Sequence, residues 1–120
     1  MPSTTLVRYY AAVDSGDLDT AMDLLAPDVR SAILLPGKAV RGTRREDLRS
    51  YLSGRGDVVR RHVPLRESVA DDVEFVYGKV VEDERTTTGY FLASVRIDDA
   101  GLIAAYQVSF DTELSLLPDA

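Results

Sequence analysis

The order of helical and extended segments constrains the fold of this chain more than any other feature of its sequence. Helical patterns are confined to the first half, whereas the second half consists of segments rich in Val, Tyr, Phe, Thr and Ile, which are typical of strands. Acidic turns separate these segments, which we place at Val58–Val69, Val73–Val81, Thr86–Asp98 and Leu102–Glu113. The pattern predicts an antiparallel meander of four long strands preceded by helices.

The beginning of the chain predicts a helical hairpin. Apolar residues recur at helical spacing from Thr4 to Val13, and Ser15-Gly16 ends this first helix. Asp17 can cap a second helix, whose apolar stripe extends as far as the break at Pro27-Asp28. Two short helices in sequence with a tight turn between them pack side by side.

A short strand and a third helix follow the hairpin. Val29–Leu35 is a run of mainly apolar residues that stops at the Pro36-Gly37 turn, which predicts a buried strand. After a brief extended piece over Val40–Gly42, Thr43 can cap a third helix that ends at Gly54. Helices followed by a strand meander predict an α+β fold with the helices on one face of the sheet.

A chain of 120 residues fits one domain, which we expect to span residues 1–120. The long strands are apolar on both sides: Phe91 and Val95 share one face of their strand, and Tyr90 and Leu92 share the other. One face can pack against the helices, and the other needs a different cover. We therefore expect a homodimer formed through the outer face of the sheet.

Composition excludes several classes of function. The formal net charge of −6 disfavours a non-specific nucleic-acid binder, and no apolar run approaches the ~20 residues of a membrane-spanning helix. No secretory signal pattern is present, so we expect a cytoplasmic protein with no membrane partner. One histidine, no cysteine and scattered carboxylates predict no metal site, and no phosphate-binding loop indicates a cofactor.

The basic residues are unevenly distributed. Between Lys38 and Arg66 the chain has nine Lys or Arg residues against three Asp or Glu residues, a local charge of +6 in a chain of net charge −6. This basic segment fits an ordinary solvated surface. It also fits a rim that attracts an anionic ligand or an acidic partner protein.

The order of elements resembles the nuclear-transport-factor-2-like (NTF2-like) superfamily with its cystatin-like cone, in particular small bacterial SnoaL-like and ketosteroid-isomerase-like proteins. The resemblance rests on RYYAAVDSGDLDTAMDLLAPDVR at the start, GTRREDLRSYL in the middle and DDAGLIAAYQVSF near the end. It implies three N-terminal helices packed in the concave face of a strongly curved mixed or antiparallel sheet. It also implies a cofactor-independent cavity for a small, largely apolar molecule, such as a polyketide, terpenoid or steroid-like compound.

The same resemblance assigns candidate catalytic positions. It places Tyr9 where ketosteroid isomerases have the tyrosine that donates to a developing oxyanion. It places Ile33 at the general base of these isomerases and Ala93 at their second oxyanion-hole acid. Since neither side chain can transfer a proton, we reject steroid isomerase activity for this chain. Tyr9 would equally fit a purely structural position in the core.

His62 is the only side chain that we expect to transfer a proton in such a cavity, because histidine titrates near neutral pH. It shares a predicted strand face with Arg60 and Arg66, so a surface position is equally compatible with the pattern. Tyr106, on the last strand, would orient or polarise a ligand oxygen. Five apolar residues would complete the ligand-binding wall, unless they fill the core entirely: Ile33, Phe91, Val95, Val108 and Phe110.

Two classes of function follow from these residues. In the first, the protein catalyses isomerisation, cyclisation or dehydration by acid–base chemistry, with Tyr9, His62 and Tyr106 as its catalytic residues. In the second, it is a non-catalytic dimeric module that binds a ligand or a partner protein, which the apolar residues at Ile33 and Ala93 favour.

Overall fold

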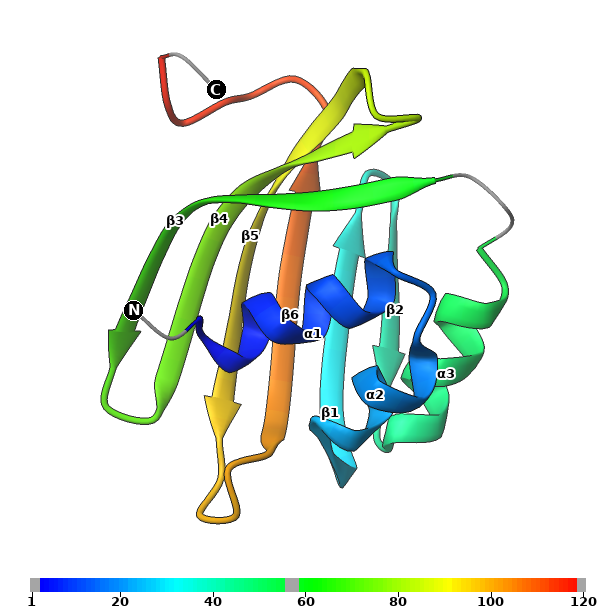
Figure 1. Cartoon of the computed structure of the whole chain (residues 1–120), viewed down its shortest axis with the longest axis vertical. Helices are drawn as coiled ribbons and strands as arrows, with labels where there is room; N and C mark the ends of the chain where they lie inside the picture. Colours follow the sequence, from blue (N-terminus) through cyan, green and yellow to red (C-terminus); the bar gives the residue numbers. More distant parts are fainter. Residues whose placement is uncertain (1–2, 56–58, 119–120) are drawn as a thin grey trace.

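The computed structural model describes residues 3–55 and 59–118 and contains three helices and a six-stranded sheet (Figure 1). The strands lie in the order β2-β1-β6-β5-β4-β3. In chain order the elements are α1 (Thr5–Asp14), α2 (Leu18–Asp23), β1 (Leu25–Leu35), β2 (Lys38–Gly42), α3 (Arg45–Ser53), β3 (Arg60–Ala70), β4 (Val73–Glu82), β5 (Thr86–Ile97) and β6 (Ile103–Asp111).

The sheet is mixed and strongly curved. Strands β3 to β6 form the expected antiparallel meander, and β1 pairs in parallel with β6 and antiparallel with β2. Helix α1 crosses the concave side of the sheet, and α2 and α3 lie beside β1 and β2 (Figure 1). The α+β fold with helices on one face is confirmed. Val58, where the sequence predicted the start of β3, lies outside the described residues. No helix of the described residues is long and apolar enough to cross a membrane.

The second helix is shorter than the sequence predicts. It ends at Asp23, and β1 starts at Leu25 rather than Val29. Leu25 pairs with Ile103 of β6, whose backbone N–H donates to the carbonyl oxygen of Leu24 at 2.9 Å. Pairing with a distant strand therefore overrides the local helical pattern. The register of β1 against β6 shifts between Leu25 and Arg30. Pro27 lies in this irregular part of the strand, and its nitrogen cannot donate a hydrogen bond to the sheet.

The third helix also begins differently from the prediction. Arg44, not Thr43, occupies the N-cap position, and its side chain makes no capping hydrogen bond. Instead the carboxylate of Asp47 accepts from the backbone N–H of Thr43 at 2.9 Å. This contact resembles the acidic half of a capping box but is displaced by one residue, to the position before the N-cap, so a carboxylate in the first turn replaces the hydroxyl that the sequence suggested.

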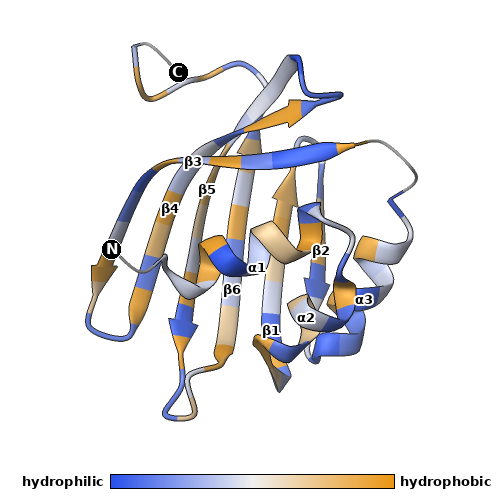
Figure 2. Cartoon of the chain, in the orientation of Figure 1, coloured by the Kyte–Doolittle hydropathy of each residue, from blue (hydrophilic) through white to orange (hydrophobic). Residues whose placement is uncertain are grey.

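Apolar and polar residues both occur along β4 and β5 (Figure 2), and burial alternates along these strands because successive side chains point to opposite faces of the sheet. Phe91 and Val95 point into the core and are almost completely buried, whereas Leu92 on the opposite face is 52% exposed. Their inward neighbours on β6 are Phe110 and Tyr106. The expected division of these strands into an inner and an outer face is therefore correct.

A buried carboxylate attaches α1 to the sheet. Glu74 of β4 is 8% exposed, and its two oxygens accept from the backbone N–H groups of Thr5 at 3.2 Å and Leu6 at 2.9 Å. These are unpaired donors of the first helical turn, where the helix dipole also favours a negative charge. Glu74 thus fixes one end of the helix whose other end carries Asp14.

Glu74→Gln is expected to lower the free energy of unfolding by about 1–3 kcal/mol, because the amide lacks the charge and has only one acceptor oxygen for two donors. Urea unfolding followed by circular dichroism measures the change. Glu113→Gln is the matched control, since Glu113 is exposed, and it should leave stability unchanged. Equal stability of the two variants would contradict the anchoring role of Glu74.

Candidate functional site

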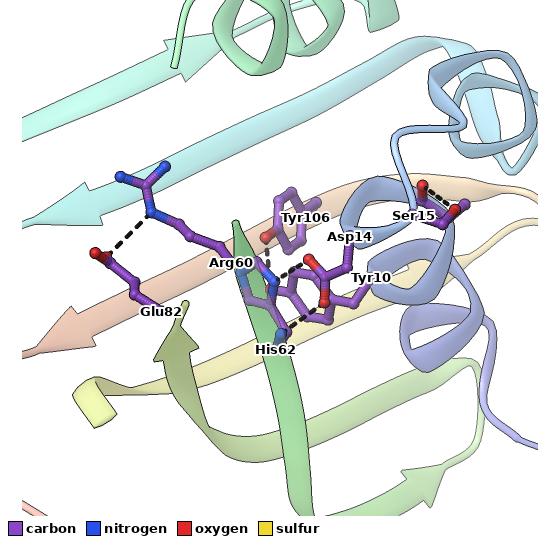
Figure 3. A network of polar contacts seen from close by, with 8 residues as sticks. Tyr10, Asp14, Ser15, Arg60, His62, Glu82 and Tyr106 are labelled. Carbon is purple, nitrogen blue, oxygen red and sulfur yellow. Dashed lines mark hydrogen bonds and ion pairs between the residues drawn. The ribbon is translucent and has the colours of Figure 1, made fainter. Parts of the chain in front are cut away.

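An aspartate and the single histidine form a close pair inside the cone (Figure 3). Asp14 is the last residue of α1, and His62 lies on β3. Oδ1 of Asp14 is 2.8 Å from Nδ1 of His62, and Oδ2 accepts from the backbone N–H of His62 at 2.6 Å. The histidine side chain is 5% exposed and that of the aspartate 13%. The structure thus places His62 in the interior, although the sequence equally allowed a surface position.

This contact determines how the imidazole can react. A carboxylate at Nδ1 holds the hydrogen on that nitrogen and leaves the lone pair of Nε2 available. The carboxylate stands at the C-terminal end of α1, where the helix dipole disfavours a negative charge and no basic residue lies in the last turn. The two donors of His62 offset this cost. The Asp14–His62 pair therefore has the arrangement of a general base with its orienting carboxylate.

Aromatic rings hold the imidazole in place. The ring of Tyr10 stacks on His62 with 4.3 Å between centroids and an angle of 10° between planes. The rings of Phe91 and Phe110 pack edge-on against the imidazole, with 5.3 Å and 6.3 Å between ring centroids. Tyr10 and Asp14 can act together on His62 because residues four apart share a face of a helix.

The expected catalytic residue Tyr106 lies in a buried hydroxyl pair. Its oxygen is 2.6 Å from the hydroxyl oxygen of Tyr10 (Figure 3). Burial raises the pKa of both side chains, so both hydroxyls keep their protons at neutral pH. Tyr106 therefore contacts Tyr10, whose ring stacks on His62, and the hydroxyl of Tyr106 is already hydrogen-bonded to that of Tyr10.

Tyr9 differs from the other two tyrosines. Its side chain is 2% exposed, yet among the described residues its hydroxyl has no hydrogen-bond partner. Burial raises its pKa, and the charge of Arg55 acts in the opposite direction. Its ring contacts the rings of Tyr10 and Tyr106 at 5.7 Å. Tyr9 is therefore a protonated donor that a ligand oxygen could use.

Two inner spaces adjoin His62. The larger is an open cavity of about 700 Å³, the size of a small-molecule site, and the smaller is a void of about 20 Å³, roughly the space that one water molecule needs. His62, Tyr51, Arg55 and Phe110 line both. The void also touches Tyr9. Tyr9 and His62 therefore line the same small void.

The predicted apolar wall divides into two parts. Phe110 lines both inner spaces, and Ile33 lines the small void. Phe91, Val95 and Val108 instead fill the core beneath them and line neither space. The walls of the large cavity come mostly from residues that the sequence analysis did not select, including Leu35, Pro36, Tyr51, Val80 and Thr88.

The prediction that Arg60, His62 and Arg66 share one strand face is correct for Arg60 and wrong for Arg66. Arg60 lines the cavity beside His62, where Glu82 pairs with it at 3.3 Å. Between Pro64 and Arg66 the register of β3 against β4 shifts by one residue, so Arg66 lies opposite Tyr77. A bulge of one residue reverses the alternation of a strand, which is why Arg66 faces away from the cavity.

Sequence reasoning missed Asp14, although a signal was present. An aspartate at the end of a helix is electrostatically unfavourable, and this one lies four residues after Tyr10. Asp14 and His62 are 48 residues apart, so only the fold brings them together. In the part of the chain that the structure describes, no three His, Asp or Glu side chains are grouped to hold a metal ion.

Comparison by structure identifies the fold. A proposed ketosteroid isomerase from Kribbella flavida superposes with a TM-score of 0.75 at 17% identity, over 95% of this chain and 80% of that one. A proposed polyketide cyclase from Sinorhizobium meliloti gives 0.67 at 23% identity, over 91% and 95%. A cystatin-like protein of unknown function from Nostoc punctiforme gives 0.70 at 19% identity, over 94% and 90%.

Sequence comparison finds no protein-family model and no curated protein that matches the chain. Further structural matches are described as NTF2-like and SnoaL-like proteins. The chain therefore has the cone-shaped NTF2-like, or cystatin-like, fold, as the resemblance in its sequence implied. At these identities the likeness identifies the fold, and the chemistry has to be argued from the residues of this chain.

Proposed function

We propose that this protein binds a small, largely apolar molecule in its cone and rearranges it by acid–base chemistry, as an isomerase, cyclase or dehydratase without a cofactor. The observation that carries the proposal is the 2.8 Å contact between Asp14 and His62 at the wall of the 700 Å³ cavity. The isomerase and cyclase descriptions of the structural matches agree with this class of reaction.

The chemistry starts at Nε2 of His62. With Nδ1–H held by Asp14, Nε2 removes a proton from a carbon next to a carbonyl group and returns it elsewhere on the ligand. Negative charge then grows on the carbonyl oxygen, and the hydroxyl of Tyr9 donates to it once the ligand reaches the small void. The resemblance in the sequence assigns Ile33 and Ala93 to the positions of the isomerase acids, so in this proposal the imidazole supplies the proton transfer.

A thermal-shift screen followed by a turnover assay tests the proposal. Steroids, aromatic polyketides, terpenoid epoxides and acyl thioesters form the panel, since a ligand at a hundred times its Kd stabilises a fold by about 2.7 kcal/mol. For the class that binds, Tyr9→Phe and His62→Ala should abolish turnover and leave the fold intact. Binding without turnover would support the non-catalytic module instead, and turnover retained by both variants would refute these roles.

We also propose that the protein is a homodimer through an outer patch formed by Phe75, Tyr77 and Leu92. Phe75 is 40% and Leu92 52% exposed, and Tyr77 lies directly opposite Leu92 on the neighbouring strand. Adjacent large apolar side chains on a sheet face indicate a protein interface. These residues lie on β4 and β5, on the face opposite to the helices.

Leu92→Arg is expected to convert the dimer to a monomer, because it places a charge in the middle of the outer patch. Light scattering after size-exclusion chromatography should show the mass falling from twice that of the chain to that of a single chain. Val69→Arg is the control: Val69 is 61% exposed but lies on the other face, at the end of β3. A wild-type protein that is monomeric at ~100 μM would refute the dimer.

A further inference from the structure

Arg55 carries an unsatisfied donor at the cavity. Among the described residues, its Nε is the one side-chain nitrogen or oxygen that is completely shielded from solvent and has no hydrogen-bond partner. The residue follows Gly54, the C-cap of α3, and its guanidinium carbon lies 5.9 Å from the centroid of the Tyr51 ring. A guanidinium N–H withdrawn from water without an acceptor is unfavourable. A ligand that supplies the acceptor would remove this cost.

Three other charged side chains on the cavity wall already have partners. Arg60 pairs with Glu82, and Asp111 accepts from two backbone N–H groups of the turn that follows it. Among the described residues Arg55 has no carboxylate partner, and neither has Lys38, which is exposed on the same wall. Both belong to the basic segment of the sequence. Within residues 3–55 and 59–118, no acidic side chain neutralises these two cations of the cavity wall.

Arg55 also lies beside the reactive groups. It lines both the large cavity and the small void, as His62 does, and its charge opposes the effect of burial on the pKa of Tyr9. A group that binds the guanidinium is thus held next to the imidazole. Binding at this position would place the adjoining carbon of the ligand within the part of the cavity that His62 lines.

We propose that the ligand of this protein is a hydrophobic carboxylic acid whose carboxylate binds Arg55, an inference that rests on the proposed use of the cavity. The planar guanidinium matches a carboxylate through two parallel hydrogen bonds. Asp111 on the same wall, which has no basic partner among the described residues, repels a second negative charge and so favours a monoanion over a phosphate dianion. Leu35, Val80 and Phe110 offer apolar contacts for the remainder of the ligand.

Matched acid and amide probes test this proposal by isothermal titration calorimetry. The pairs are 2-naphthoate with 2-naphthamide, cinnamate with cinnamamide, and biphenyl-4-carboxylate with its amide. At least one acid should bind wild-type protein about 10–100-fold more tightly than its amide, the effect of a charge-assisted hydrogen-bonded pair. Arg55→Gln should remove this preference. Arg61→Gln, which removes the same charge from an exposed position on β3, should retain it.

The outcomes separate this inference from the proposed catalysis, because binding of the probes requires no turnover. An acid preference that survives in His62→Gln supports the role of Arg55, even if no reaction is ever found. If no acid binds better than its amide to wild-type protein, including the case in which none binds, the proposal is overturned. A preference that persists in Arg55→Gln also overturns it. If Arg55→Gln fails to fold, the test is made on wild-type protein alone. Tighter binding of the acid than of its amide, with a difference that is lost at high salt, then supports the proposal, and no such difference overturns it.

Discussion

Asp14→Asn is expected to lower kcat/KM for the ligand found by screening by about 10²–10⁴-fold. Asparagine keeps the shape of the side chain but can offer an N–H to Nδ1 of His62, which favours the wrong tautomer. The hydrogen then moves to Nε2, the nitrogen that must accept the proton. The variant should also lose about 1–3 kcal/mol of stability, since one amide oxygen replaces two carboxylate oxygens that receive the two N–H groups of His62.

The tautomer can be measured without a substrate. His62 is the only histidine of the sequence, so the imidazole nitrogens of a ¹⁵N-labelled sample belong to one residue. Wild-type protein at high pH should show hydrogen on Nδ1, and Asp14→Asn should show it on Nε2. Asp17→Asn is the control, because Asp17 is an exposed helix cap three residues away that asparagine can replace. A wild-type imidazole with its hydrogen on Nε2 would contradict the orienting role of Asp14.

Asp14 also illustrates why the fold was more predictable than the site. The helical hairpin and the meander follow from local periodicity, which the sequence displays directly. The contact of Asp14 with His62 depends instead on how β3 crosses α1, and the bulge after Pro64 decides which later residues face inward. Register is a long-range property, so the side of the strand on which Arg66 lies could not be derived from its neighbours.

Tyr9 shows the opposite case. Its inward direction could be predicted from the resemblance to known cones, which placed a tyrosine at this position. The state of its hydroxyl could not, since it depends on which tyrosine Tyr106 contacts. The structure pairs Tyr106 with Tyr10, the neighbour of Tyr9, and so leaves the Tyr9 hydroxyl free among the described residues. The hydroxyl of Tyr10 is therefore structural, whereas that of its neighbour Tyr9 is a candidate catalytic group.

Gly78→Ala is expected to have the largest effect on stability of the glycine-to-alanine changes in the sheet, since its added Cβ meets the closest neighbours. A Cβ atom at Gly78 would lie 2.6 Å from Cζ of Phe91 and would overlap the carbonyl oxygen of Val63. The ring is fully buried and the oxygen belongs to the backbone of β3, so neither can move freely. Forcing extra volume into a packed core costs about 1–3 kcal/mol, which urea unfolding would measure.

The same substitution should also lower turnover, because Val63 directly follows His62. If β3 moves to admit the methyl group, the imidazole shifts away from Asp14, and a displacement of about 1 Å at a reacting group can cost about 10²-fold in rate. Gly54→Ala is the control for stability alone, since its added Cβ would meet nothing closer than 3.4 Å but Gly54 lines the large cavity. Lower stability of Gly78→Ala with unchanged turnover and tautomer would mean that Phe91, not β3, gives way. Such a result would contradict the hypothesis that the close approach of β3 to Gly78 keeps His62 in contact with Asp14.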